Sequence, residues 1–145
     1  MRKWSKFVRL SPGDRGLLIF SFVLLCSLRV ALWLVPFSLL QRLSERSRRT
    51  VTPPGPVDVQ RIRWAVDTAG GLWPHATCLP RAMAAQMLLA RKGARSEIRL
   101  GVRWGIHRKF EAHAWLEQEG GPVIGGLPDL SRYARLQDHG QDAAL

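Results

Sequence analysis

The sequence predicts an α+β fold in which helices come first and a small antiparallel sheet follows. In residues 58–70, apolar side chains recur every three or four positions, which is typical of a helix that buries one face. Residues 97–104 and 110–117 instead alternate apolar and polar side chains, as half-buried strands do. Glycines at 120–121 then mark a hairpin turn into a further strand. The length of 145 residues suits one compact domain with an N-terminal extension.

Residues 12–36 are predicted to form a long apolar helix. Ser11 can cap its first turn, and Asp14 complements the helix dipole. Its apolar run, 17–35, is interrupted by Arg29. A bilayer span takes roughly 20 residues, but a charged side chain near its middle costs about 2.5–3.5 kcal/mol. Three arrangements stay open: a helix packed on the domain, a helix in a membrane interface, and a true membrane span.

The Pro-rich stretch 51–57 is the clearest linker in the chain. A second short helix, with leucines on one side, is expected before it over residues 37–48. The predicted organisation is therefore a basic, hydrophobic helical segment over 1–50, the linker, and a chemical domain over 58–145.

Positive charge is concentrated in the N-terminal segment. The net charge is +11, and residues 1–50 hold 10 Lys and Arg against two acidic residues. Such an arm could contact anionic lipid, nucleic acid or an acidic peptide, or simply form a solvated surface. Because no nucleic-acid-binding motif accompanies it, nucleic acid is not an expected partner. Cys26 and Cys78 lie in unlike settings, which argues against a disulfide and fits the cytoplasm, with membrane association through residues 12–36 left open.

The chemical domain is expected to contain a second helix over residues 78–92. Thr77 is a good N-cap for it, Pro80 is tolerated in its first turn, and Gly93 stops it. After the two alternating strands, a third short strand is expected near residues 122–127.

Cys78 and His113 are the candidate nucleophile and base of a cysteine-peptidase-type site. A thiol attacks as the thiolate, and a free cysteine, with a pKa of about 8.5, is only slightly ionised at neutral pH. Cys78 begins the predicted helix, where unpaired N–H groups favour an anion and could stabilise the oxyanion of acyl transfer. His113 lies within a strand, which is a rigid mount for a general base. Since each residue alone is more often structural, the pair carries the prediction.

Several blocks of the sequence carry a family resemblance. Residues 72–82, LWPHATCLPRA, resemble the cysteine block of the lasso-peptide leader peptidases, transglutaminase-like proteins related to the microcin J processing protease. LLARKG at 88–93 and IRLGVR at 98–103 continue the similarity, and FEAHAWLE at 110–117 is very similar to the histidine block. The resemblance covers residues 58–136. It implies a papain/transglutaminase-like core, with the nucleophile at a helix N-terminus packed on a small antiparallel sheet.

The same resemblance implies a Cys-His-Asp triad. In it Cys78 attacks the peptide carbonyl, His113 transfers the proton, and an acid orients the imidazole. Where the family often has that acid, this chain has Gly125. Asp129 is the predicted third member, because an antiparallel strand after the glycine turn brings residues 127–129 alongside His113. A backbone carbonyl or a water could orient the ring instead.

Trp73 and Trp115 are predicted to bind substrate, although packing is an equally good interpretation of both. His75 and Cys78 have HxxC spacing, but zinc sites usually rest on two such pairs. We therefore expect no metal and no cofactor.

The family resemblance implies a cysteine peptidase that removes the leader from a ribosomally made lasso precursor before ring closure. The expected partners are the precursor peptide, a separate leader-recognition protein, and an ATP-dependent, asparagine-synthetase-like lasso cyclase. Two alternatives stay open: a transglutaminase-type acyltransferase, which passes the acyl group to an amine, and a non-catalytic scaffold for a precursor-modifying complex.

Overall fold

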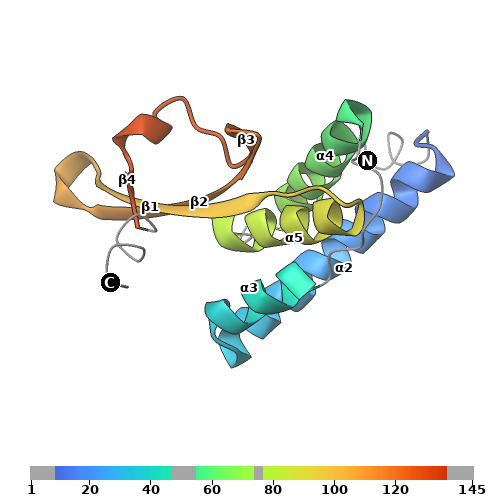
Figure 1. Ribbon diagram of the computed structural model, residues 1–145, viewed down its shortest axis with the longest axis horizontal. Helices are drawn as coiled ribbons and strands as arrows, with labels where there is room; N and C mark the ends of the chain where they lie inside the picture. The colour runs from blue at the N-terminus through green and yellow to red at the C-terminus, as the bar shows by residue number, and fades with distance from the viewer. Residues whose placement is uncertain (1–8, 47–54, 74–76, 137–145) are drawn as a thin grey trace.

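The structure is a computed structural model that describes residues 9–46, 55–73 and 77–136 (Figure 1). It confirms the predicted α+β fold, with helices packed on a four-stranded antiparallel sheet of order β3-β2-β1-β4. The elements in chain order are the helices α2 (Pro12–Leu34), α3 (Phe37–Arg46), α4 (Pro56–Leu72) and α5 (Cys78–Arg91), then the strands β1 (Glu97–Trp104), β2 (Phe110–Gln118), β3 (Gly121–Ile124) and β4 (Ala134–Arg135).

The N-terminal helix begins as its sequence predicts. The Ser11 hydroxyl oxygen accepts the N–H of Asp14 at 3.2 Å, and α2 ends just before Pro36. The short helix α3 follows, while residues 47 and 48 of its predicted range lie outside the described residues. Most of the predicted linker lies outside them too, so the division of the chain at 51–57 stays a prediction.

The two helices of the predicted chemical domain are confirmed with small shifts in their bounds. α4 begins at Pro56 rather than at Asp58, because proline suits the first helical position and lacks only an N–H that the helix would not use. α5 begins at Cys78 and ends at Arg91, and Gly93 beyond it has a φ of +83°, which favours glycine.

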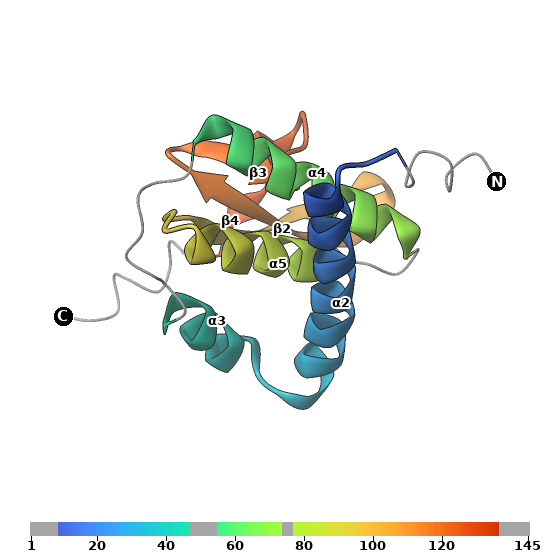
Figure 2. The same cartoon turned by 90° about the vertical axis from the view of Figure 1, so that its right-hand side faces the viewer.

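Helix α5 is central to the molecule. It contacts β1, β2 and β3 of the sheet, and it also contacts α2, α3 and α4 (Figure 2). Nine of its side chains are buried, which small residues make possible. One hydrophobic core joins these helices to the sheet and includes Leu18, Leu25, Leu28, Ile62, Val66, Met83, Leu89, Ile98, Leu116 and Ile124. The N-terminal helix α2 therefore shares its core with the rest of the fold.

The sheet is built around a long hairpin. β1 and β2 pair along their whole length, from Glu97 opposite Glu117 to Trp104 opposite Phe110. β3 pairs only with the last residues of β2, and it ends at Ile124 rather than near residue 127. The strand stops there because the next residue, Gly125, turns the chain with a φ of +72°.

A fourth strand was not predicted. β4 contains two residues, which lie opposite Gly101 and Val102 of β1. So short a strand has no periodicity of its own, and its pairing depends on the path of the preceding loop. Gly101 allows this packing, since a Cβ there would lie 2.9 Å from the side chains of both Trp115 and Tyr133.

Candidate active site

Cys78 is the first residue of α5, and it faces the edge of β2. The Thr77 side chain makes no capping hydrogen bond, although Thr77 occupies the N-cap position as predicted. The Cys78 Sγ instead accepts the backbone N–H of Ala114 at 3.4 Å. β3 pairs with β2 only from Leu116 onward, so Ala114 lies beyond the end of that pairing. The structure thus brings the predicted nucleophile next to the strand residue that follows His113.

The imidazole of His113 is held by a main-chain carbonyl. Its Nε2 lies 2.7 Å from the carbonyl oxygen of Gly125. A carbonyl only accepts hydrogen bonds, so Nε2 must carry the proton in this contact. In the neutral ring, Nδ1 is then the unprotonated nitrogen that can act as a base. Among the described residues, the imidazole of His113 and the thiol of Cys78 are not hydrogen-bonded to each other.

Gly125 can hold this position because it is a glycine. Its φ of +72° is a conformation that side chains other than glycine rarely adopt. A Cβ at this residue would also lie 2.9 Å from the carbonyl oxygen of Ala114 and 3.3 Å from Trp115 Cα. The chain can therefore pass close enough to β2 for the carbonyl to reach the ring of His113.

Two aromatic side chains flank the imidazole. The Trp115 ring lies nearly parallel to it, with centroids 6.1 Å apart, and the Tyr133 ring is centred 5.7 Å away. Trp115 also donates its indole N–H to Glu117 at 2.9 Å, which fixes the ring. The imidazole is therefore oriented by one hydrogen bond and confined by two packed rings.

Asp129 does not contact His113 in the structure. Among the described residues its carboxylate pairs with Arg103, and the ring nitrogen available to an orienting acid is bound by Gly125 instead. The hydrogen bond from Arg103 lowers the pKa of Asp129 below its ordinary value of 3.8. Arg103 in turn binds Glu111 at 2.7 Å and lies over the Tyr133 ring at 4.6 Å. Asp129 thus fixes the loop before Tyr133. It is connected to the imidazole indirectly, through Arg103 and the Tyr133 ring.

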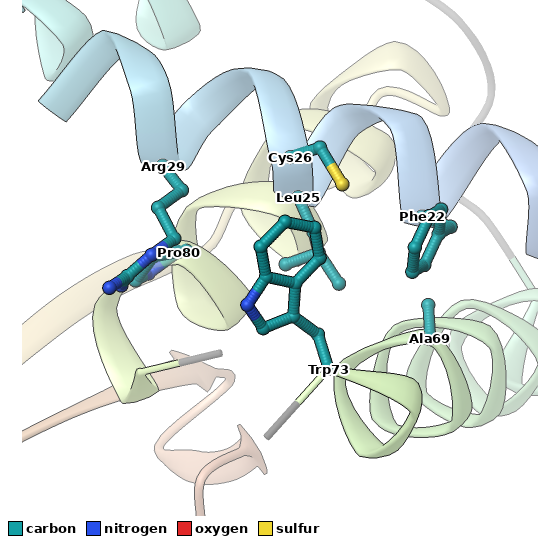
Figure 3. Close-up of a pocket in the computed structure, with 7 residues that line it drawn as sticks. All are labelled: Phe22, Leu25, Cys26, Arg29, Ala69, Trp73 and Pro80. Carbon is teal, nitrogen blue, oxygen red and sulfur yellow. The ribbon is translucent and has the colours of Figure 1, made fainter. Parts of the chain in front are cut away.

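The two predicted substrate-binding tryptophans occupy different environments. Trp115 is 1% exposed and its indole packs beside His113, so substrate binding by Trp115 stays a prediction. Trp73 lies at the end of α4 and lines a small apolar cavity under α2 with Phe22 and Pro80 (Figure 3). The cavity measures about 10 Å³, about what one water needs. Substrate binding by Trp73 therefore stays a prediction, and in this structure the indole packs.

Sequence reasoning missed the roles of Tyr133 and Arg103. Tyr133 is the single tyrosine of the chain and follows a short turn, so neither spacing nor alternation marks it. Its importance comes from β4, which holds it over the sheet.

As for metals, His75 lies outside the described residues, and the described ones contain no group of three or more potential metal ligands.

A helix that begins with a cysteine and packs on an antiparallel sheet carrying a histidine is the arrangement of papain-like proteins. The family model described as the transglutaminase-like superfamily matches residues 22–138, and the chain belongs to that superfamily. Its members include cysteine peptidases and acyltransferases. The match begins inside α2, so the family domain includes the second half of that helix. No curated protein and no solved structure matches the chain.

Proposed function

We propose that this protein is a cysteine peptidase that removes the leader from a ribosomally made lasso-peptide precursor before ring closure. The observation that carries the chemistry is the position of Cys78 at the start of α5, beside the strand that holds His113. The lasso-precursor substrate is supported by the similarity of the cysteine and histidine blocks to the leader peptidases.

We propose one order of proton transfers, in which the His113 nitrogen that Gly125 does not bind acts as the base. Nδ1 of His113 takes the thiol proton as Sγ forms a bond to the scissile carbonyl carbon. The carbonyl electrons move onto oxygen, and the N–H groups of Cys78 and Leu79, which Thr77 does not cap, are donors on the nucleophile's own turn. The C–N bond then breaks, and the imidazolium returns its proton to the leaving amine. Water hydrolyses the thioester and restores the thiol.

In this proposal the Gly125 carbonyl takes the part that the acid plays in a Cys-His-Asp triad. It fixes the tautomer and the orientation of His113, which are the requirements for a base. It lacks the negative charge that would stabilise an imidazolium. We therefore expect a working dyad rather than a triad, with a slower rate than an aspartate would support.

The proposed partners are the precursor peptide, a separate leader-recognition protein and an asparagine-synthetase-like cyclase. The test incubates precursor and recognition protein with this protein, and follows the products by mass spectrometry. Hydrolysis cuts the precursor into leader and core, whereas acyl transfer to an added amine increases the mass of the leader. Cleavage that survives Cys78→Ala would exclude the mechanism, and cyclisation supported by Cys78→Ala with pre-cleaved core would indicate a scaffold.

A further inference from the structure

The helix α2 has one face in the core and another face that none of the described residues covers. Its buried side chains, Leu18, Ser21, Leu25 and Leu28, recur every three or four residues and pack on α4 and α5. The opposite side carries apolar residues that are 54–86% exposed, namely Ile19, Val23, Val30, Trp33 and Leu34. We call these five residues the outer stripe. It extends from Ile19 to Leu34, the last residue of the helix.

Two charged residues of α2, Arg29 and Asp14, turn away from the outer stripe, while Arg15 lies one turn before Ile19 on the same side of the helix. Arg29 points to Pro80 at the start of α5, and both side chains line the cavity under α2 (Figure 3). Asp14 binds Arg61 of α4 at 2.7 Å. Ser27, the exposed polar residue along the stripe, bonds its hydroxyl to the carbonyl of Val23 at 2.8 Å. The outer stripe is therefore apolar from Ile19 to Leu34, with Arg15 one turn before it and the Ser27 hydroxyl paired.

The composition around the helix indicates what covers this surface. Exposed arginines stand before and after it, at Arg9 and Arg42. Residues 1–50 as a whole hold 10 Lys and Arg against two acidic residues. An apolar stripe flanked by basic residues, with a tryptophan near one end, matches the chemistry of an anionic lipid surface.

The packing of α2 distinguishes lying on a membrane from crossing it. By length and composition α2 could span a bilayer. A span would have to remove Leu18, Leu25 and Leu28 from the core and place Arg29 in hydrocarbon. A helix parallel to the surface keeps the core and the Arg29 contact, and buries only the outer stripe.

We propose that the outer stripe of α2 binds an anionic membrane surface, with the helix axis parallel to the bilayer. The proposal concerns α2 and is independent of the reaction at Cys78. It makes the protein a peripheral membrane protein, attached through one face of a helix that also belongs to the folded domain.

The test is flotation of the full chain with vesicles of phosphatidylcholine, alone or with phosphatidylglycerol. We expect binding to the mixed vesicles, weakened by salt, and a loss of about 10-fold or more for the double variant Val23→Glu, Val30→Glu. Ile106→Glu is the matched control, because Ile106 is 81% exposed on the β1–β2 turn, away from α2. The control should bind as the wild type does.

Four results would overturn the proposal. One is an absence of flotation with mixed vesicles, and another is an equal loss for Ile106→Glu and the double variant. Light scattering that shows a dimer, abolished by the double variant, would assign the stripe to a second copy. Retention in the membrane after alkaline carbonate, which releases peripheral proteins, would show that α2 spans. Circular dichroism of each variant separates loss of binding from loss of folding.

Discussion

Cys26 and Cys78 are both partly buried thiols, but their surroundings differ. Cys26 lies in the middle of α2 and lines an apolar cavity with Trp73. Cys78 begins a helix, and its Sγ accepts the N–H of Ala114 beside His113. A nucleophilic thiol needs a hydrogen-bond donor and a base to receive its proton, and of the two cysteines Cys78 has a described donor and lies beside the strand that carries His113. The comparison teaches that the local backbone, rather than the residue type, makes Cys78 the candidate nucleophile and Cys26 a packing residue.

The strongest test of this contrast is to remove each thiol in turn. Cys78→Ala should reduce precursor cleavage by about 10³-fold or more, because the nucleophile is lost. Cys26→Ala removes a small apolar group and should leave kcat/KM within about 2-fold. A chromatographic assay of leader release measures both. Equal losses would show that the contrast between the two sites is wrong.

A substitution at Gly125 tests whether the difference between Cys78 and Cys26 depends on the orientation of His113. Gly125→Ala should lower kcat/KM by about 10²-fold, because a strained φ and the contact with the Ala114 carbonyl displace the acceptor of Nε2. Gly126→Ala is the matched control, since a Cβ there would meet Pro122 at an ordinary 3.4 Å. Thermal unfolding of both variants shows whether the fold persists. Full activity of folded Gly125→Ala would exclude a positioning role for this carbonyl.

Alkylation of the folded protein compares the two thiols directly. With iodoacetamide at neutral pH, we expect Cys78 to react about 10-fold faster than Cys26, because Cys26 lines an apolar cavity under α2, whereas Cys78 lies at a helix start beside the N–H of Ala114. Peptide mapping by mass spectrometry gives the two rates. Gly125→Ala should slow the reaction of Cys78 and leave that of Cys26 unchanged. Faster labelling of Cys26 would contradict the assignment.

The smallest expected effect on activity is that of Asp129→Asn. If Asp129 belonged to a triad, this change would cost about 10⁴-fold. Because Asp129 pairs with Arg103 instead, we expect a change in kcat/KM of about 3-fold or less. Initial rates of leader release with the same precursor measure it.

The same variant has a predicted pH dependence of stability. Arg103 lowers the pKa of Asp129 in the folded protein below the ordinary value of 3.8. The pair therefore stabilises the fold above pH 3.8, and this contribution is lost as the pH falls through the lower, folded-state pKa. Asp129→Asn should lower Tm by about 2 °C at pH 7, and by less at pH 2. An equal difference at both pH values would show that the ion pair contributes nothing.

Much of the fold could be predicted from local patterns. The alternation over residues 97–104 matches β1 at both ends, and Thr77 as N-cap locates the first residue of α5. The apolar positions of β1 alternate and α5 has a capping residue at its start, so both leave a local signal in the sequence. β4 leaves none, because two residues have no period.

The candidate site was only partly predictable. Cys78 and His113 stand out because a helix start and a strand centre can be located from sequence. The carboxylate of Asp129 could pair with either Arg103 or the imidazole of His113. No local pattern in the sequence predicts which of the two it binds. Trp115 lies on the face that alternation marks as polar, and its burial comes from Tyr133, which the loop brings over it.

The carbonyl that binds His113 also has a consequence for how this site can change by mutation. An aspartate in that place could be lost by a single codon change, but every residue has a main-chain carbonyl. The glycine at position 125 permits the backbone turn that directs this carbonyl toward the imidazole of His113. A search for side-chain triads would therefore pass over this protein, whereas a search for a glycine turn beside the histidine would find it.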